Sequence, residues 1–292
     1  MKKIILALLV VGACWGAPLQ AQDWNDALLA EVQKAAEQGD AKAQYNLAVR
    51  YGRGQGVAQD AAQAVSWTRK AAEQGDVDAQ FILGVMSEVA QDDTQALTWI
   101  RKAAEQGHAG AQFKLGIRYT NGRGVPQDDK QAVAWWRKAA EQGDADAQFN
   151  LGVSYSKGQG VAQDYKQAYA WFHKAAKQDV AEAQAILGDM HTNGRGIPQD
   201  DKQAVAWYRK AAEQGDAGAQ FNLGVMYFNG RGVPQDDKKA YVWFSVAAAN
   251  GDANGAKNRD FAAMRLTPAA LSEAQALAGR YFEQYQPNPK GL

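Results

Sequence analysis

The sequence predicts an all-α solenoid of helix–turn–helix repeats, and two observations predict it. Residues 121–143 (NGRGVPQDDKQAVAWWRKAAEQG) recur almost unchanged at 193–215, and an intermediate copy stands at 157–179. The outer copies are 193 − 121 = 72 residues apart, so the period is 36 residues. Within each period, apolar residues recur at helical spacing on both sides of a glycine-rich stretch. Such a period indicates one elongated array rather than separate globular domains.

The N-terminal residues 1–21 are predicted to be a secretory signal peptide. Two lysines precede an apolar run from Ile4 to Cys14, which is too short to span a bilayer as a mature helix. We expect cleavage after Ala21 and residence in the periplasm of a Gram-negative bacterium. A lipoprotein signal is the alternative, because residues 11–14 (VGAC) resemble a lipobox whose cysteine becomes lipidated. Secretion is a further alternative.

Charge and cysteine content exclude several classes of function. The chain carries 32 basic and 32 acidic residues, so it has no excess of positive charge for a phosphate backbone or an anionic membrane. Cys14 is its only cysteine. Cleavage after Ala21 would leave no disulfide, no thiolate metal ligand and no cysteine nucleophile.

Six periods account for most of the chain. They span residues 40–75, 76–107, 108–143, 144–179, 180–215 and 216–251. Residues 22–39 keep only the second-helix motif and are expected to form an N-terminal capping half-repeat. Residues 252–292 are expected to form C-terminal capping helices and a tail, with a last helix that starts at Thr267-Pro268.

Each period opens with a first helix of the form A-Q-x-x-L-G-x-x-Y. In the third copy Ala111, Leu115 and Tyr119 follow one another at intervals of four residues, which places them on one apolar face. Glycine inside a helix costs about 1 kcal/mol relative to alanine. Gly116 and its copies therefore need a compensating reason, and we expect the partner helix to approach closely there.

A glycine-rich loop and a second helix complete the period. Residues 121–126 (NGRGVP) supply glycines for left-handed backbone and a proline that ends the first helix. Asp128 is expected to cap the second helix, with Gln131 completing a capping box, and Gly143 stands where a C-terminal cap belongs. In the second period SEVAQDD (87–93) replaces the longer loop, which predicts a tighter turn.

One tryptophan recurs in every second helix. Because these residues are periodic, we expect them to pack between helices rather than to bind a ligand. They are Trp67, Trp99, Trp135, Trp171, Trp207 and Trp243. In the third copy the core position could be either Trp135 or Trp136.

The helix A-Q-x-x-L-G-x-x-Y, the loop G-x-G-V and the helix D-x-x-x-A-x-x-W-x-x-K-A-A-x-x-G together resemble the Sel1-like repeat, a relative of the tetratricopeptide repeats. The resemblance covers residues 40–251. It implies a right-handed superhelical α-solenoid whose first helices line a concave groove that binds a protein or peptide.

Function is expected where the copies differ, because residues common to all copies serve the packing of one repeat on the next. The positions expected to line the groove are Lys42, Asn46, Arg50, Asp78, Ile82, Met86, Lys114, Arg118, Asp146, Asn150, Glu182, Ile186, Met190, Asn222 and Met226. Related repeats hold peptide backbones with an asparagine just before L-G, which implies that role for Asn46, Asn150 and Asn222. The alternative is a solvated helix face.

No motif indicates catalysis, a cofactor or a metal. His173 and His191 could approach each other across stacked repeats, but no carboxylate stands at ligand-like spacing beside them, so they are expected to be ordinary histidines, as is His108. Ser154 to Lys157 matches S-x-x-K without the companion motifs of β-lactam-recognising enzymes. The sequence thus predicts an exported, non-enzymatic scaffold or adaptor. An effector that engages a host protein and an envelope enzyme of β-lactam-binding type are the alternatives.

Overall fold

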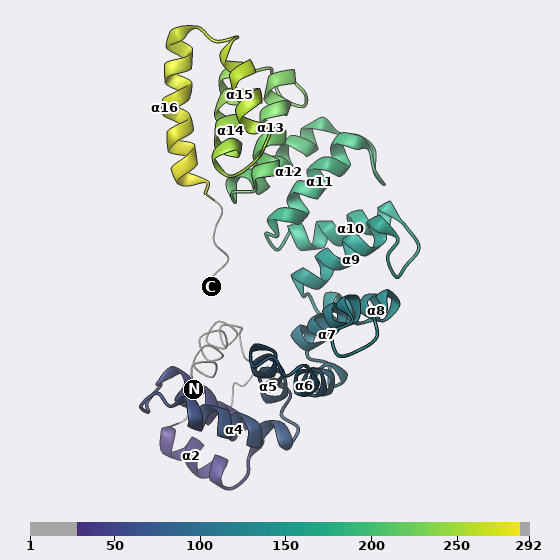
Figure 1. Cartoon of the computed structure of the whole chain (residues 1–292), viewed down its shortest axis with the longest axis vertical. Coiled ribbons are helices and arrows are strands. Elements are labelled where there is room, and N and C mark those ends of the chain that lie inside the picture. Colours follow the sequence, from purple (N-terminus) through teal and green to yellow (C-terminus); the bar gives the residue numbers. More distant parts are fainter. Residues whose placement is uncertain (1–27, 287–292) are drawn as a thin grey trace. The chain divides into compact units, whose positions relative to one another are not determined.

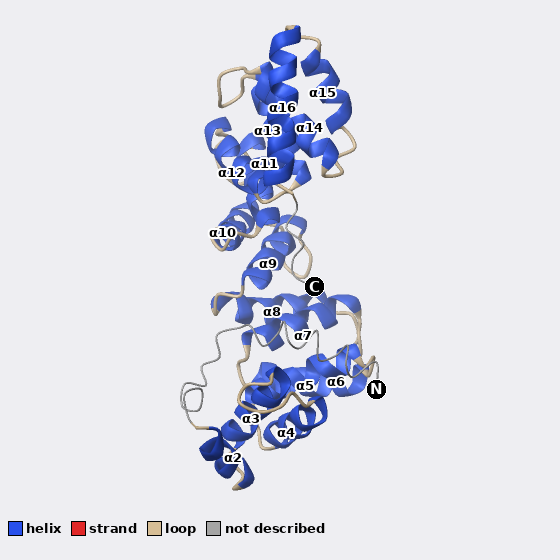
Figure 2. Cartoon of the chain, turned by 90° about the vertical axis from the view of Figure 1, so that its left-hand side faces the viewer, coloured by secondary structure: helices blue, strands red, loops and turns tan. Residues whose placement is uncertain are grey.

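The computed structural model describes residues 28–286, and within that range it contains fifteen α-helices and no strand (Figures 1 and 2). The predicted signal peptide, its alternative lipidation site Cys14 and the last six residues lie outside the described residues. The chain divides into two compact units, with the boundary between Asp144 and Ala145.

The first unit holds the N-terminal half-repeat and three helix pairs, and the second holds three pairs and the C-terminal helices. The helices of the first unit are α2 (Leu29–Glu37), α3 (Ala41–Arg53), α4 (Ala61–Glu73), α5 (Val77–Val89), α6 (Asp93–Glu105), α7 (Ala109–Asn121) and α8 (Asp129–Glu141). Those of the second are α9 (Ala145–Lys157), α10 (Tyr165–Ala176), α11 (Ala181–Asn193), α12 (Asp201–Glu213), α13 (Ala217–Asn229), α14 (Asp237–Ala249), α15 (Gly255–Ala263) and α16 (Pro268–Gln284).

Within the units, successive helices from α2 to α8 and from α9 to α15 pack on each other, and α16 packs on α14. The two helices of one repeat make the most extensive contacts, as in α11 with α12, and the second helix then packs on the first helix of the next repeat, as in α12 with α13. This arrangement confirms the prediction of an all-α solenoid of helix–turn–helix repeats.

The helix glycines are compensated by close approach of the partner helix, as expected. A Cβ on Gly116 would lie 2.4 Å from Trp136, and one on Gly188 would lie 2.4 Å from Tyr208. The other copies repeat this arrangement with Gly84 against Ile100, Gly152 against Phe172 and Gly224 against Phe244. At the equivalent positions the first repeat carries a larger residue, Ala48, in place of the glycine and a smaller one, Thr68, in place of the large side chain, and both are fully buried.

The periodic tryptophans contribute to the core less than predicted. Trp243 is buried, but the five earlier ones are half-buried. The fully packed position is the next residue, which faces the glycine, so Trp136 and not Trp135 is the core residue of the third repeat. A lysine three residues further along the helix lies over each half-buried ring. Lys138 Nζ, for example, is 4.0 Å from the centre of the Trp135 ring. These rings cover the edge of the core while the lysine stays hydrated.

The helix caps are confirmed in part. Asp128 Oδ1 accepts hydrogen bonds from the backbone N–H groups of Lys130 and Gln131, and the loop glycines Gly122 and Gly124 have left-handed backbone. The capping box also predicts a hydrogen bond from the backbone N–H of Asp128 to the Gln131 side chain, and this part of the prediction is wrong. The backbone N–H of Asp128 donates to the carbonyl of Tyr119 at 2.9 Å, so it is already used in joining the two helices.

The short second repeat has the tight turn that was expected. Only residues 90–92 separate α5 from α6, and Gln91 adopts left-handed backbone (φ 63°) without being glycine.

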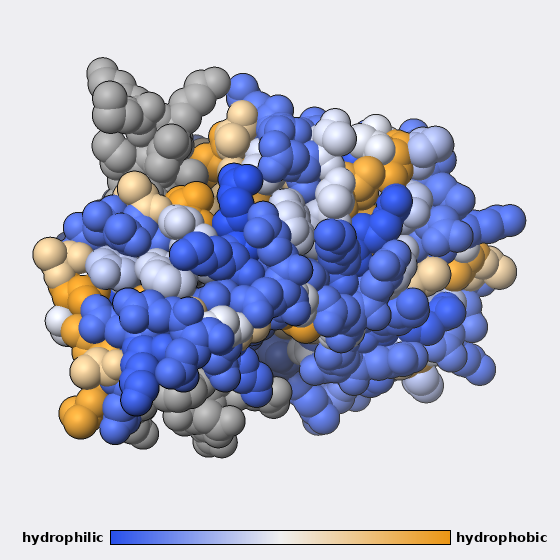
Figure 3. Space-filling model, turned by 90° about the horizontal axis from the view of Figure 1, so that it is seen from below, coloured by the Kyte–Doolittle hydropathy of each residue, from blue (hydrophilic) through white to orange (hydrophobic). Residues whose placement is uncertain are grey.

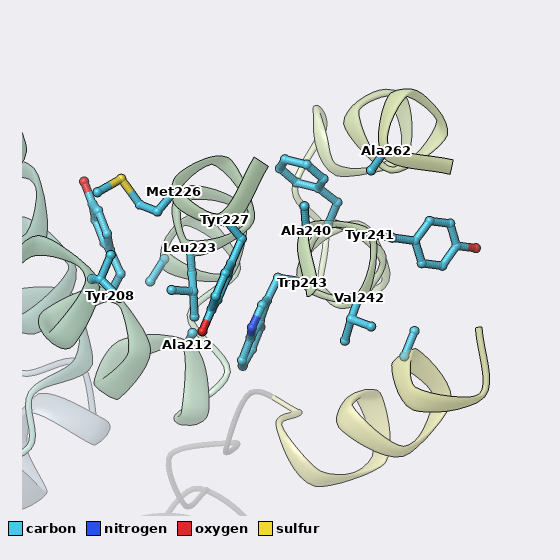
Figure 4. Packing of buried hydrophobic residues seen from close by; sticks show 14 of the residues in the cluster. Tyr208, Ala212, Leu223, Met226, Tyr227, Ala240, Tyr241, Val242, Trp243 and Ala262 are labelled. Carbon is cyan, nitrogen blue, oxygen red and sulfur yellow. The ribbon is translucent and has the colours of Figure 1, made fainter. Parts of the chain in front are cut away.

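The C-terminal helices close the second unit. Thr267 caps α16 by accepting a hydrogen bond from the Ala270 N–H, with Pro268 in the first turn, as predicted. Figure 4 shows the core that these helices complete, with Tyr227 and Trp243 lying side by side. Trp243 also stacks on Tyr285 at the end of α16, with ring centres 5.7 Å apart.

Candidate functional site

A chain of buried glutamines links successive repeats. In α11 the Gln184 amide donates to the Ala176 carbonyl of the preceding second helix at 3.1 Å and accepts from Gln214 of its own repeat at 2.8 Å. Gln44, Gln80, Gln112 and Gln220 make the equivalent bonds to the preceding second helix. Each of these carbonyls lies at a helix C-terminus and also accepts a backbone N–H, as Ala176 does from Asp179 at 3.2 Å, so the glutamine amide adds a second donor from the next repeat. The glutamine of the A-Q motif is therefore structural.

The glycine-rich loops dock on the preceding repeat. A Cβ on Gly232 would lie 2.2 Å from the carbonyl oxygen of Asp201, at the start of α12, so only glycine fits there. Arg231 beside it pairs with the Asp201 side chain at 2.8 Å. Hydrogen bonding to Arg231 lowers the pKa of Asp201. The parts of the loop that recur in the copies thus also help to pack one repeat on the preceding one.

The predicted groove residues fall into three groups. Three are exposed: Lys42, Asp146 and Glu182. Six are half-buried: Arg50, Asp78, Lys114, Asn150, Ile186 and Asn222. Six are buried, and for them the expectation of an exposed side chain is wrong: Asn46, Ile82, Met86, Arg118, Met190 and Met226.

The preceding repeat buries most of this last group. Met86, Met190 and Met226 stand at the same position in their repeats, in the penultimate turn of the first helix, and each packs into a cluster with residues of the preceding second helix. In Figure 4, Met226 points towards Tyr208 of α12. Ile82 joins the cluster that contains Met86. Spacing along one helix could not show that a neighbouring helix covers this position.

Arg118 occupies the same position in the third repeat and is 2% exposed. Its guanidinium pairs with Glu88 at 3.2 Å and with Asp93 at 3.4 Å, the two residues that flank the short turn between α5 and α6. Lys114 also pairs with Glu88 at 2.8 Å. Arg118 is a buried charge with partners inside the chain, which fits a structural role better than a partner-binding role.

The three asparagines do not share one environment. Asn46 is 6% exposed, and its side-chain oxygen accepts from Arg50 Nε at 2.9 Å. Asn150 and Asn222 are half-buried, and the Asn222 amide donates to Asp189 at 3.3 Å. Only Asn150 and Asn222 therefore keep the partial exposure that the predicted peptide-binding role requires.

The histidines do not assemble a metal centre. Among residues 28–286, no group of three or more histidine, cysteine, aspartate or glutamate side chains could hold a metal ion. His108 caps α7 by accepting the Ala111 N–H, and it lies 3.5 Å from Asp78. His173 and His191 both contact the ring of Tyr169, which confirms that stacked repeats bring them close.

One face of the molecule is mainly polar. Figure 3 shows a face on which hydrophilic residues predominate and hydrophobic ones form separate small patches. Within the described range, no helix has both the length and the apolar character needed to cross a bilayer.

A family model decides the relationship of the chain to known proteins. The model for the Sel1 repeat matches six times, at residues 41–76, 77–108, 109–144, 145–180, 181–216 and 217–252. The chain belongs to the Sel1 repeat family. These Sel1 repeats begin one residue later than the periods read from the sequence.

Solved structures of other Sel1 repeat proteins are similar. One is a protective antigen present in uropathogenic Escherichia coli strains, with 40% identity and a TM-score of 0.76 over 88% of this chain and 56% of that chain. Another is a Sel1 repeat protein from Oxalobacter formigenes, with 38% identity and a TM-score of 0.65 over 77% of this chain and 66% of that chain. The chain thus spans less than two thirds of either. No curated protein matches it.

Proposed function

We propose that this Sel1 repeat protein is a non-enzymatic scaffold that binds a protein or peptide through the first helices of its repeats. One observation supports this proposal most strongly. The residues that most copies share are used in packing, as glycine contacts, glutamine links and helix caps. Several residues that differ between copies and remain accessible, such as Asn150 and Glu182, lie on the first helices, and α-solenoids use such surfaces for binding.

The second unit offers the best-defined part of this surface. Asn150 on α9 and Ile186 on α11 are half-buried, and Glu182 on α11 is exposed. An amide that donates and accepts suits a peptide main chain, an aliphatic side chain adds apolar contact, and a carboxylate adds selectivity for a basic group.

We expect a variant that replaces Asn150, Glu182 and Ile186 by alanine to lose its partner and keep its fold. Each lost amide or charged contact should weaken binding by roughly 1–3 kcal/mol. The changes at Asn150 and Glu182 should alter stability by about 0.5 kcal/mol each, and the change at Ile186, which packs against the core, by about 1 kcal/mol. Affinity capture from envelope extracts, followed by binding isotherms and thermal melts, measures both quantities.

The matched control replaces Lys166, Gln167 and Lys202, three exposed residues of the second helices, by alanine. This control should capture the partner as the native chain does. Normal capture by the first-helix variant would refute the binding surface.

Export is the second part of the proposal. The N-terminal segment carries the charge and apolar run of a signal peptide. Mass spectrometry of the mature protein should find Gln22 as the first residue. A lipid-modified Cys14 would instead place the protein on a membrane anchor.

A surface or secreted effector is the main alternative. The similar Escherichia coli protein is described as a protective antigen, and an antigen is recognised by the immune system of a host. Capture of a host protein in preference to an envelope protein would favour this alternative. A β-lactam hydrolysis assay tests the remaining hypothesis, an envelope enzyme of β-lactam-binding type, and we expect no turnover.

A further inference from the structure

The junction between the fourth and fifth repeats departs from the others at paired positions. Two residues after the periodic tryptophan, the second helix carries arginine at the first, second, third and fifth junctions. Near its end, the next first helix carries tyrosine at the second, third and fifth junctions and Ser87 at the first. At the fifth junction these residues meet, because the Arg209 guanidinium donates to the Tyr227 hydroxyl at 2.8 Å. At the fourth junction both are replaced, by His173 on α10 and His191 on α11.

The two imidazoles pack on one shared ring. The centre of the Tyr169 ring lies 5.8 Å from that of His173 and 5.7 Å from that of His191. The Tyr169 hydroxyl is 3.4 Å from His191 Nε2, and His173 also packs edge-on against Trp207 of α12, with centres 5.8 Å apart. The aromatic cluster of Tyr169, His173, His191 and Trp207 thus joins three helices of the second unit.

His191 is poorly placed to carry a charge. Its side chain is 8% exposed, and Nδ1 has no hydrogen-bond partner within the described part of the chain. A protonated imidazole would need a second acceptor, and burying a charge without one is costly.

The surrounding charges add to this cost. Lys177, just after α10, and Lys210 of α12 act on His173, while Asp200 before α12 and His173 itself act on His191. Among these groups Asp200 is the anion, and it acts on His191, whereas both lysines act on His173.

We propose that this histidine pair makes the junction between α10 and α11 a pH-sensitive joint, which is closed near neutral pH and opens in mild acid. Two neutral imidazoles pack on Tyr169, whereas two imidazolium ions repel each other and require water. Opening would separate α11 from α10 and so change its spacing from α9, which packs on the other side of the joint against α10. Binding across the first helices α9 and α11 would then be released by acid.

The direction of the pH effect follows from the two histidines. Burial lowers the pKa of His191, with Asp200 opposing and His173 adding to the shift, and burial with Lys177 and Lys210 lowers the pKa of His173. The unfolded or opened chain therefore binds more protons than the closed one. The stability of the closed joint is therefore fully present above the ordinary histidine pKa of about 6.5. It is lost as the pH falls from there through the lower pKa values of the folded chain.

Hydrogen exchange of the full chain at pH 7.5 and 5.5 tests this joint. After correction for intrinsic exchange, the amides of α10 and α11 should exchange severalfold faster at pH 5.5, and those of α14 should change little. In the double variant His173→Arg/His191→Tyr, which restores the pair seen at the next junction, α10 and α11 should be equally protected at both pH values.

His108→Asp is the matched control, because it restores the aspartate found at that position in other repeats and lies in the first unit. It should leave the acid-induced exchange of α10 and α11 unchanged. Should the double variant fold poorly, an NMR titration of the native imidazoles decides the matter. Two histidines with ordinary pKa values, or equal protection of α10 and α11 at both pH values, would overturn the proposal.

Discussion

Replacing Leu187 by alanine should destabilise the second unit by about 2–5 kcal/mol. Leu187 lies in the middle of α11 and is fully buried in a cluster with Phe172 and Met190. Removing its methyl groups costs their transfer free energy and leaves a cavity that the surrounding helices can fill only in part. Chemical denaturation followed by tryptophan fluorescence measures the change in the free energy of unfolding.

Ile186→Ala is the matched control, because it shortens a side chain of the same volume at the adjacent position of the same helix. Ile186 is half-buried, so the expected cost is less than half as large. Partner capture should show the reverse order, with Ile186→Ala reducing capture more than Leu187→Ala. Equal losses of stability in the two variants would contradict the assignment of Leu187 to the buried face of α11 and of Ile186 to its accessible face.

Replacing Gly188 by alanine should also destabilise the chain, by about 2 kcal/mol, although alanine is the better helix former. The new Cβ would lie 2.4 Å from two ring carbons of Tyr208, which is 2% exposed and held by hydrogen bonds to Asp189 and Thr192. Overpacking of about 3 kcal/mol outweighs the gain in helix propensity of about 1 kcal/mol. Thermal and denaturant unfolding give the net effect.

Gly279→Ala provides a control of opposite sign. Gly279 is also inside a helix, but a Cβ there would meet no atom within 4 Å. This substitution should therefore stabilise the chain by up to about 1 kcal/mol. A Gly188→Ala variant as stable as Gly279→Ala would show that the helices are free to move apart.

A second-site change tests the same contact. The first repeat pairs Ala48 with Thr68 where the fifth pairs Gly188 with Tyr208. The double variant Gly188→Ala/Tyr208→Thr should lose less stability than the sum of the two single changes, because the smaller residue makes room for the new methyl group. Strict additivity would mean that the two positions do not interact.

The repeat period, the order of helix and loop, and the sites of capping and close approach follow from the amino-acid sequence alone. These features depend on local rules, because Asp128 caps the helix that directly follows it and a glycine such as Gly116 can be recognised from its cost within one helix. Most of the repeat architecture could therefore be predicted, together with the exposed members of the candidate surface, such as Lys42 and Glu182.

Which side chains the neighbouring repeat covers depends on how the helices pack. Arg118 and Met226 stand on the predicted surface when one helix is considered alone, but contacts with the preceding repeat bury them. The same holds for Trp136 against Trp135, for the glutamine links and for the pairing of His173 with His191. These contacts join residues that lie 8 to 30 positions apart in the sequence, and their geometry depends on how the helices of one repeat and of neighbouring repeats pack. Helical spacing within one repeat carries no information on that packing.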